Sequence, residues 1–181
     1  MSELYMHYVC TRDEARAILD RQKRFWVSNC GCRERRGGCA RSRIDLCLEF
    51  RPVNASGGSG LREISRAEVE EILREAEARH LVMRPFRDES RQQTEGFCVC
   101  CDDCCGYFLS PTEERCDKGA LIQSTDAAAC TDCGDCTHVC YFGARKMEDG
   151  RLAVDSDACY GCGLCLDVCP AGCIRMVARH P

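Results

Sequence analysis

Two stretches of the chain place apolar residues at helical spacing behind a polar cap. Thr11 and Glu14 form a capping box, and a short apolar stripe follows it at Ala15, Ile18 and Leu19. Ser65 and Glu68 form a second box, and the residues spaced i, i+3, i+4 and i+7 behind it are Val69, Ile72, Leu73 and Ala76. The pattern predicts one helix beginning at Thr11 and a second, with one buried face, over 65–79.

The segment "HLVMRPF" at 80–86 predicts an extended strand after the second helix, and the Gly/Ser-rich residues 51–60 predict a flexible loop. A helix followed by an extended segment is also typical of the end of a winged helix. Residues 61–87, however, contain six arginines and six acidic residues, whereas a DNA-reading helix normally has a basic surface. We therefore interpret the helix as a packing element and expect no nucleic-acid partner.

Cysteine changes this picture, because it accounts for 20 of the 181 residues. The hydrophobic fraction of 45 % includes these cysteines, so the supply of aliphatic side chains for a core is small. A chain of this composition needs additional stabilisation, which bound metal clusters can supply.

The opening residues 1–20 do not have the basic, apolar and small-residue regions of a secretory signal. No stretch approaches the ~18–20 apolar residues of a membrane span. We therefore expect a cytoplasmic protein without a membrane span. Thiols stay reduced in that compartment, and clustered cysteines there more often bind metal than form disulfides.

The clearest motif is a repeat of C-x2-C-x2-C-x3-C near the end of the chain. It occurs in "ACTDCGDCTHVCYFGARKM" at 129–147 and again in "ACYGCGLCLDVCPAGCIRM" at 158–176. The two copies resemble the bacterial two-cluster ferredoxins over about residues 126–178. The resemblance implies two 4Fe–4S clusters, of which the first is held by Cys130, Cys133, Cys136 and Cys169. The second is held by Cys159, Cys162, Cys165 and Cys140, so each copy lends its fourth cysteine to the other cluster.

Three residues near this motif need separate interpretation. The ferredoxin family has proline directly after the fourth cysteine. In this chain the second copy has Pro170 at that place, but the first copy has Tyr141, so the local turn there is expected to differ. Cys173 lies outside the pattern and is interpreted as a buried packing residue. His138 is interpreted as a surface residue of a helix.

Nine further cysteines lie in two groups earlier in the chain, namely Cys30, Cys32, Cys39 and Cys47, then Cys98, Cys100, Cys101, Cys104 and Cys105. With the helix between them, these groups resemble the N-terminal module of poorly characterised multi-cluster ferredoxin-like proteins from anaerobes, over about residues 27–108. The resemblance implies one or two additional iron–sulfur clusters bound by these cysteines.

The chemistry of the nine thiols leaves their partition open. They exceed the four ligands of one cubane, and they suffice for two cubanes or one larger cluster. Adjacent pairs such as Cys100 and Cys101 are more suited to bridging two irons, or to serving two centres, than to one small cubane. Zinc is the alternative for these groups, since four-thiolate zinc sites also use closely spaced cysteines. Cys10 and Cys116 fit no pattern and are expected to be free thiols, although Cys116 could join the second group.

Positive charge is concentrated near the first cysteine group. Residues 12–43 carry ten Lys/Arg against four Asp/Glu. A thiolate-bound cluster is negatively charged, so nearby cations would offset its charge and raise its reduction potential; the candidates are Arg33, Arg35, Arg36, Arg41 and Arg43. The alternative is that this stretch is simply a solvated basic loop.

Together these observations predict an α+β protein with a helical, loop-rich cysteine module at 1–116 and a two-cluster ferredoxin-like domain at 117–181. Its expected function is electron transfer, as a dedicated subunit that relays single electrons through three or four clusters to a partner oxidoreductase, in anaerobic metabolism. Two alternatives remain open: a reductive enzyme that uses an atypical N-terminal cluster, and an iron–sulfur redox-sensing regulator. No acid–base pair or nucleophile constellation indicates conventional catalysis.

Overall fold

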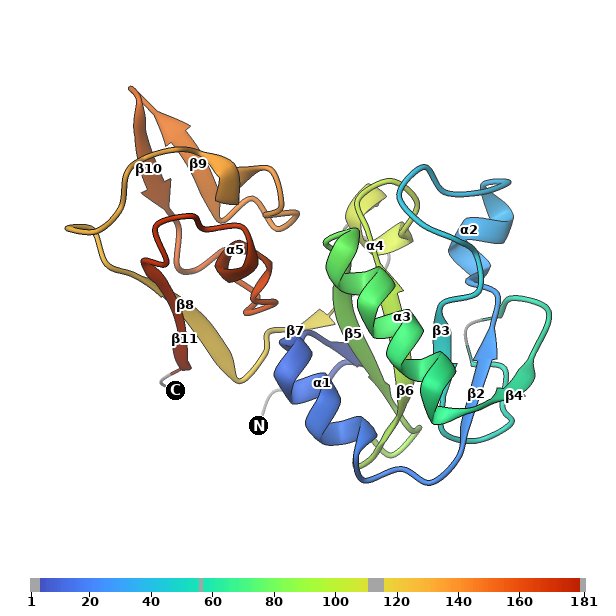
Figure 1. Cartoon of the computed structure of the whole chain (residues 1–181). Helices are drawn as coiled ribbons and strands as arrows, with labels where there is room; N and C mark the ends of the chain where they lie inside the picture. Colours follow the sequence, from blue (N-terminus) through green and yellow to red (C-terminus); the bar gives the residue numbers. More distant parts are fainter. Residues whose placement is uncertain (1–3, 56, 111–115, 180–181) are drawn as a thin grey trace.

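The computed structural model describes residues 4–55, 57–110 and 116–179, which form a larger N-terminal part and a smaller C-terminal part (Figure 1). Within these residues, the N-terminal part contains a sheet of seven strands in the order β4-β2-β3-β6-β5-β1-β7. The strands are β1 His7–Tyr8, β2 Phe25–Ser28, β3 Cys47–Glu49, β4 Arg62–Ile64, β5 Val82–Arg87, β6 Thr94–Cys100 and β7 Cys116–Asp117. Neighbouring strands are antiparallel except β1 and β7, which are parallel.

Both predicted capping boxes are present. Thr11 caps α1 (Arg12–Leu19) and Ser65 caps α3 (Arg66–Ala78). The buried side chains of α3 are the predicted stripe, Val69, Ile72, Leu73 and Ala76. The predictions of these two helices are therefore confirmed. The longer of them, α3, has 13 residues, and none of the described helices has the length and apolarity that crossing a membrane requires.

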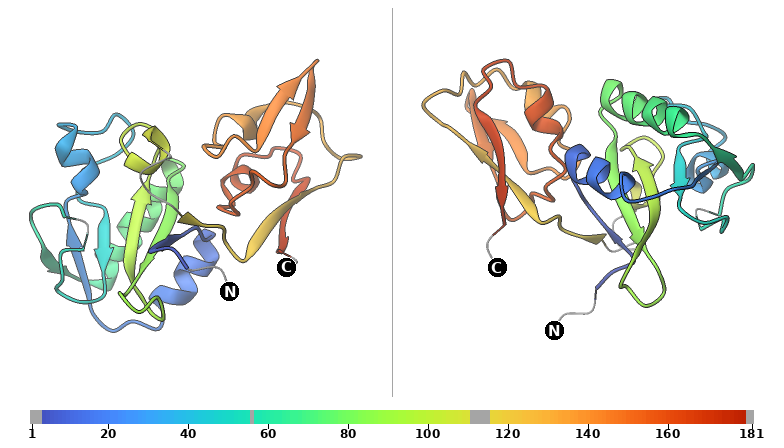
Figure 2. Two further views of the ribbon diagram at one scale, coloured as in Figure 1. Left: turned by 180° about the vertical axis from the view of Figure 1, so that it is seen from behind. Right: turned by 60° about the horizontal axis from the view of Figure 1, so that its bottom comes forward.

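The main core lies between α3 and the sheet. α3 crosses the front of the sheet in Figure 1 and is behind it in the reversed view of Figure 2. Leu73 from α3 and Leu19 from α1 are fully buried in one apolar cluster with Phe97 of β6. β5, the extended segment predicted after α3, pairs with β6 and β1 well inside the sheet, so it is not the wing of a winged helix.

The structure confirms a mixed α/β composition but corrects one part of the predicted fold. The N-terminal part is built on a sheet rather than being helical and loop-rich. Besides α1 and α3, its described helices are the short α2 (Gly31–Arg35) and α4 (Gly106–Leu109). The difference arises because several cysteine-containing segments pair as strands: Cys47 lies in β3, and Cys98 and Cys100 lie in β6. Cysteine has no strong helical preference, so strand pairing decides these segments.

The C-terminal part contains two small antiparallel sheets. β8 (Leu121–Thr125) pairs with β11 (Ile174–Ala178), and β9 (Arg145–Glu148) pairs with β10 (Arg151–Val154). Two short helical turns lie at equivalent places in the two sequence repeats, namely η1 (Asp135–Thr137) and α5 (Leu164–Asp167).

The two parts of the chain touch at the start of α1. Arg12 forms an ion pair with Asp167 of α5. A Cβ atom placed on Gly163 would lie 3.3 Å from the methyl carbon of Thr11, so this glycine lets the two parts approach closely.

Candidate metal-binding sites

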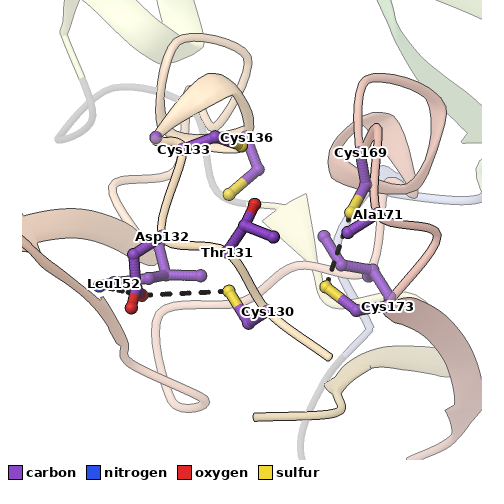
Figure 3. Close-up of a pocket in the computed structure, with 11 residues that line it drawn as sticks. Cys130, Thr131, Asp132, Cys133, Cys136, Leu152, Cys169, Ala171 and Cys173 are labelled. Atoms are coloured by element: carbon purple, nitrogen blue, oxygen red, sulfur yellow. Dashed lines mark hydrogen bonds between the residues drawn. The ribbon is translucent and has the colours of Figure 1, made fainter. Parts of the chain in front are cut away.

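The four cysteines that the ferredoxin resemblance assigns to the first cluster line one cavity of the C-terminal part; they are Cys130, Cys133, Cys136 and Cys169. In Figure 3 the sulfur atoms of Cys130, Cys136 and Cys169 face the same space. Cys173 also lines this cavity, and its sulfur lies 3.5 Å from that of Cys169. It is buried, as expected, but it also contacts a proposed ligand, which the repeat pattern gave no reason to expect.

The four cysteines assigned to the second cluster line another cavity; they are Cys140, Cys159, Cys162 and Cys165. Phe142 and Tyr160 form an aromatic part of its wall, and their rings are stacked with centroids 4.5 Å apart. The structure therefore brings the eight cysteines together as two sets of four, and each set takes its fourth member from the other repeat.

Glycines shape the loops that carry the third cysteine of each repeat. Gly134 and Gly163 adopt left-handed backbone conformations with φ of 83° and 81°. A side chain at either position would be strained, so glycine suits both. Each glycine is directly followed by the helical turn that holds Cys136 or Cys165.

A buried arginine contacts cysteines of both cavities. Arg145 is 3 % exposed, and its Nη1 lies 3.4 Å from the sulfur of Cys136. Its Nη2 donates to Gln123 Oε1 at 2.6 Å and to Thr125 Oγ1 at 2.9 Å. Burial opposes the positive charge, but the thiols of Cys165 and Cys136 outweigh this effect and raise the pKa of Arg145. Sequence reasoning missed this residue, since a single arginine in a strand carries no recognisable signal.

Six cysteines of the N-terminal part form a group that we call the six-thiol ring. Each side chain contacts two others, and the contacts close a ring in the order Cys30, Cys32, Cys105, Cys100, Cys98 and Cys47. The members come from the start of α2, from β3, from β6 and from the start of α4. Four separate elements thus deliver thiols to one place.

A second buried arginine lies against the six-thiol ring. Arg84 of β5 is 1 % exposed, and its Nη1 lies 3.2 Å from the sulfur of Cys105 and 3.7 Å from that of Cys100. Burial opposes its charge, but the surrounding thiols raise the pKa of Arg84. Nε2 of His7 lies 3.7 Å from the sulfur of Cys98, another member of the ring. Burial, followed by the charge of Arg84, lowers the pKa of His7 to about 4, so this histidine is neutral.

The remaining three of the nine thiols form a separate three-thiol group, Cys39, Cys101 and Cys104. The sulfur of Cys101 lies 3.5 Å from that of Cys39 and 3.4 Å from that of Cys104. The nine N-terminal cysteines thus divide into six and three. Cys100 and Cys105 belong to the six-thiol ring, whereas their neighbours Cys101 and Cys104 belong to the three-thiol group. Each adjacent pair thus serves two centres, which is one of the two interpretations that the sequence allowed.

The predicted cations have mixed surroundings. Arg33 is fully buried beside the three-thiol group, and Nη2 of Arg35 lies 3.5 Å from the sulfur of Cys32. Arg41 and Arg43 instead pair with carboxylates, those of Asp102 and Asp45. Of the predicted cations, Arg33 and Arg35 therefore lie where they can offset thiolate charge. Sequence reasoning missed the other two arginines that contact cysteines, Arg84 and Arg145.

The single residues behave largely as interpreted. His138 is exposed. Cys10 lies in the main core, where burial raises its pKa well above the usual value. Cys116 is also buried and contacts Arg84 beside the six-thiol ring. Tyr141, in place of the family's proline, packs edge-to-face on Phe108 with centroids 5.9 Å apart.

An aromatic cluster connects the six-thiol ring to the second four-thiol cavity. Phe142 lies with its ring centroid 5.2 Å from that of Phe108 and 6.2 Å from that of Tyr107. The same apolar cluster contains Cys100 and Cys105 at one side, with Cys162 and Tyr160 also packed in it. Thiols of both sites therefore pack in one apolar cluster with these rings.

Comparison with known proteins supports the C-terminal assignment. A family model described as a 4Fe-4S dicluster domain matches residues 122–170, which include all eight cysteines of the repeat. None of the curated proteins searched matches the chain. The likeness of residues 27–108 to multi-cluster proteins from anaerobes therefore stays a prediction.

Proposed function

We propose that this protein transfers single electrons through iron–sulfur clusters, as a dedicated ferredoxin-like subunit of a larger oxidoreductase. One observation carries the proposal: the repeat that matches a 4Fe–4S dicluster domain places its cysteines four and four around two cavities. A cubane with four thiolate ligands supplies a one-electron couple and leaves no iron free for substrate. The described residues of each cavity thus fit the group that the family implies.

In this proposal the chain divides into an N-terminal module at 1–116 and a ferredoxin-like domain at 117–181. The module holds at least one further iron–sulfur cluster, with the six-thiol ring as its ligands. Support comes from Arg84, which is 1 % exposed and lies 3.2 Å from the sulfur of Cys105, because a buried positive charge needs a negative partner and a thiolate-bound cluster would supply one. Together with the two C-terminal sites, this gives a relay of at least three centres.

The route between the sites uses the chain's own packing. Thiols of the six-thiol ring and of the second cavity both pack in the apolar cluster around Phe142. Arg145 touches cysteines of both C-terminal cavities, so these two sites are also close to each other. Cys133 of the first cavity is exposed, so that end of the relay lies near the surface, where a partner can dock.

The test is the iron and sulfide content of the full chain, purified without oxygen. Two C-terminal clusters require about eight irons per chain, and a cluster in the six-thiol ring adds about four or more. EPR spectra recorded during stepwise reduction should show each centre taking up one electron. A folded, colourless preparation without iron would contradict the proposal.

The subunit role is tested separately, on the protein isolated from its native source. We expect it to elute from size exclusion in a complex with an oxidoreductase. A stable isolated monomer would refute the subunit role, while leaving electron transfer by a free carrier intact.

A further inference from the structure

The three-thiol group differs in geometry from both four-thiol cavities. Its sulfur atoms all lie within 4.8 Å of one another, with two of the separations at 3.4 and 3.5 Å. In the part of the chain that the structure describes, no other set of three or more Cys, His, Asp or Glu ligand atoms is so compact. The proposed ligands of the two cubanes, in particular, do not meet this condition.

The spacing suits a single metal ion. Tetrahedral zinc binds thiolate sulfur at about 2.3 Å, which places two sulfur ligands of the same ion about 3.8 Å apart. Two of the separations, 3.4 and 3.5 Å, lie slightly below that value, and the third is no more than 4.8 Å. Cysteines of a cubane bind different irons, and their sulfur atoms are therefore held farther apart.

Buried charge favours the same conclusion. Arg33 is 0 % exposed, and its Nη2 donates to the carbonyl oxygen of Val99 at 3.0 Å. Its Nε and Nη1 have no hydrogen-bonded oxygen among the described residues. The guanidinium instead lies near Cys30 of the six-thiol ring and beside the thiols of Cys39 and Cys104. Three thiolates and one divalent ion carry a net charge of about −1, and the charge of Arg33 offsets part of it.

The fourth position of such an ion has no cysteine or histidine in this group. The carboxylate of Asp103 contacts the side chain of Cys39 and accepts a hydrogen bond from the backbone N–H of Ala40 at 2.8 Å. Its neighbour Asp102 is engaged by a bidentate ion pair with Arg41. Because the group offers no fourth cysteine or histidine, we assign the fourth position to an oxygen ligand on the side of the group where Asp103 lies.

We propose that Cys39, Cys101 and Cys104 bind one zinc ion, with an oxygen ligand in the fourth position. This site is independent of the electron-transfer function. Its location gives it a role in connecting the two parts of the chain, because Arg41, which pairs with Asp102 beside Cys101, also stacks on the ring of Tyr141 at 5.2 Å. Tyr141 directly follows Cys140, a proposed ligand of the second cluster.

The experiment measures zinc, iron and sulfide together on the full chain, from cells supplied with both metals. We expect about one zinc per chain, and zinc X-ray absorption should show three sulfur ligands at about 2.3 Å and one oxygen ligand. Cys104→Ser should lose the zinc and keep the iron and sulfide of the wild type. The matched control, Cys10→Ser, changes another buried cysteine outside all these groups and should keep all three.

Two outcomes would overturn the proposal: a wild-type protein without zinc, or a Cys104→Ser variant that loses iron and sulfide in place of zinc. The second outcome would mean that the group binds an iron–sulfur cluster, and the proposed electron transfer would stand. If Cys104→Ser does not fold, cobalt exchanged into the wild-type protein gives the answer. Tetrahedral thiolate coordination should give intense charge-transfer bands, and their absence would refute the site.

Discussion

Arg145 offers a direct test of how this chain controls its clusters. Its guanidinium is buried and lies 3.4 Å from the sulfur of Cys136, with Cys165 of the other cavity also nearby. Reduction adds one negative charge to a cluster, and a fixed cation beside it stabilises that charge. We predict that Arg145→Met lowers the reduction potentials of both proposed C-terminal clusters.

The size of the effect follows from Coulomb's law. With a charge separation of about 6 Å and an effective dielectric constant of about 20, the attraction is about 3 kcal/mol. For one electron this corresponds to about 120 mV, since 59 mV is a tenfold change in the equilibrium constant. Gln123 and Thr125 lie at the same guanidinium and can reorient when the charge is removed, so 120 mV is an upper value. We expect a lowering of at least about 40 mV.

The assay is an EPR-monitored redox titration of the full-length protein at fixed pH and ionic strength. Arg145→Lys keeps the charge and should give a smaller shift than Arg145→Met. Arg151→Met removes a cation from the exposed start of the neighbouring strand β10, where solvent screens it, and should leave the potentials nearly unchanged. Equal potentials in the wild type and Arg145→Met, or a rise in the variant, would refute the reasoning.

Three further predictions concern ligands and stability. Cys162→Ser should lose about four irons per chain, whereas Cys173→Ala, which removes a thiol of the first cavity that is not among the proposed ligands, should keep the full iron content; loss of iron from both variants in colorimetric assays would contradict this distinction. Ser65→Ala removes the side-chain cap of α3 and should destabilise the protein by about 1 kcal/mol, whereas Ser65→Asp keeps a capping side chain and should retain most of the stability. Thermal denaturation followed by circular dichroism measures both variants. Leu73→Ala creates a cavity in the core between α3 and the sheet and should cost about 2–5 kcal/mol; a change in melting temperature no larger than that of Ser65→Ala would argue against the described packing.

The sequence by itself determined the features that depend on local spacing. The capping boxes at Thr11 and Ser65 could be predicted because cap and partner lie three residues apart, within one helical turn. The C-terminal dicluster domain could be predicted because three of its four cysteines in each repeat lie on one short loop. In both cases neighbouring residues of the chain bring these atoms together, and only the fourth cysteine of each cavity comes from the other repeat.

The tertiary structure alone decided how the nine N-terminal thiols divide. Their positions run from Cys30 to Cys105, and the strand order, which no local pattern encodes, places α2, β3, β6 and α4 around one site. Cys100 ends β6 and Cys101 follows it, and successive side chains of an extended chain point to opposite sides. One therefore joins the six-thiol ring and the other the three-thiol group. The buried arginines were equally hidden from the sequence, because the burial of a charge depends on which thiols the folded chain gathers around it.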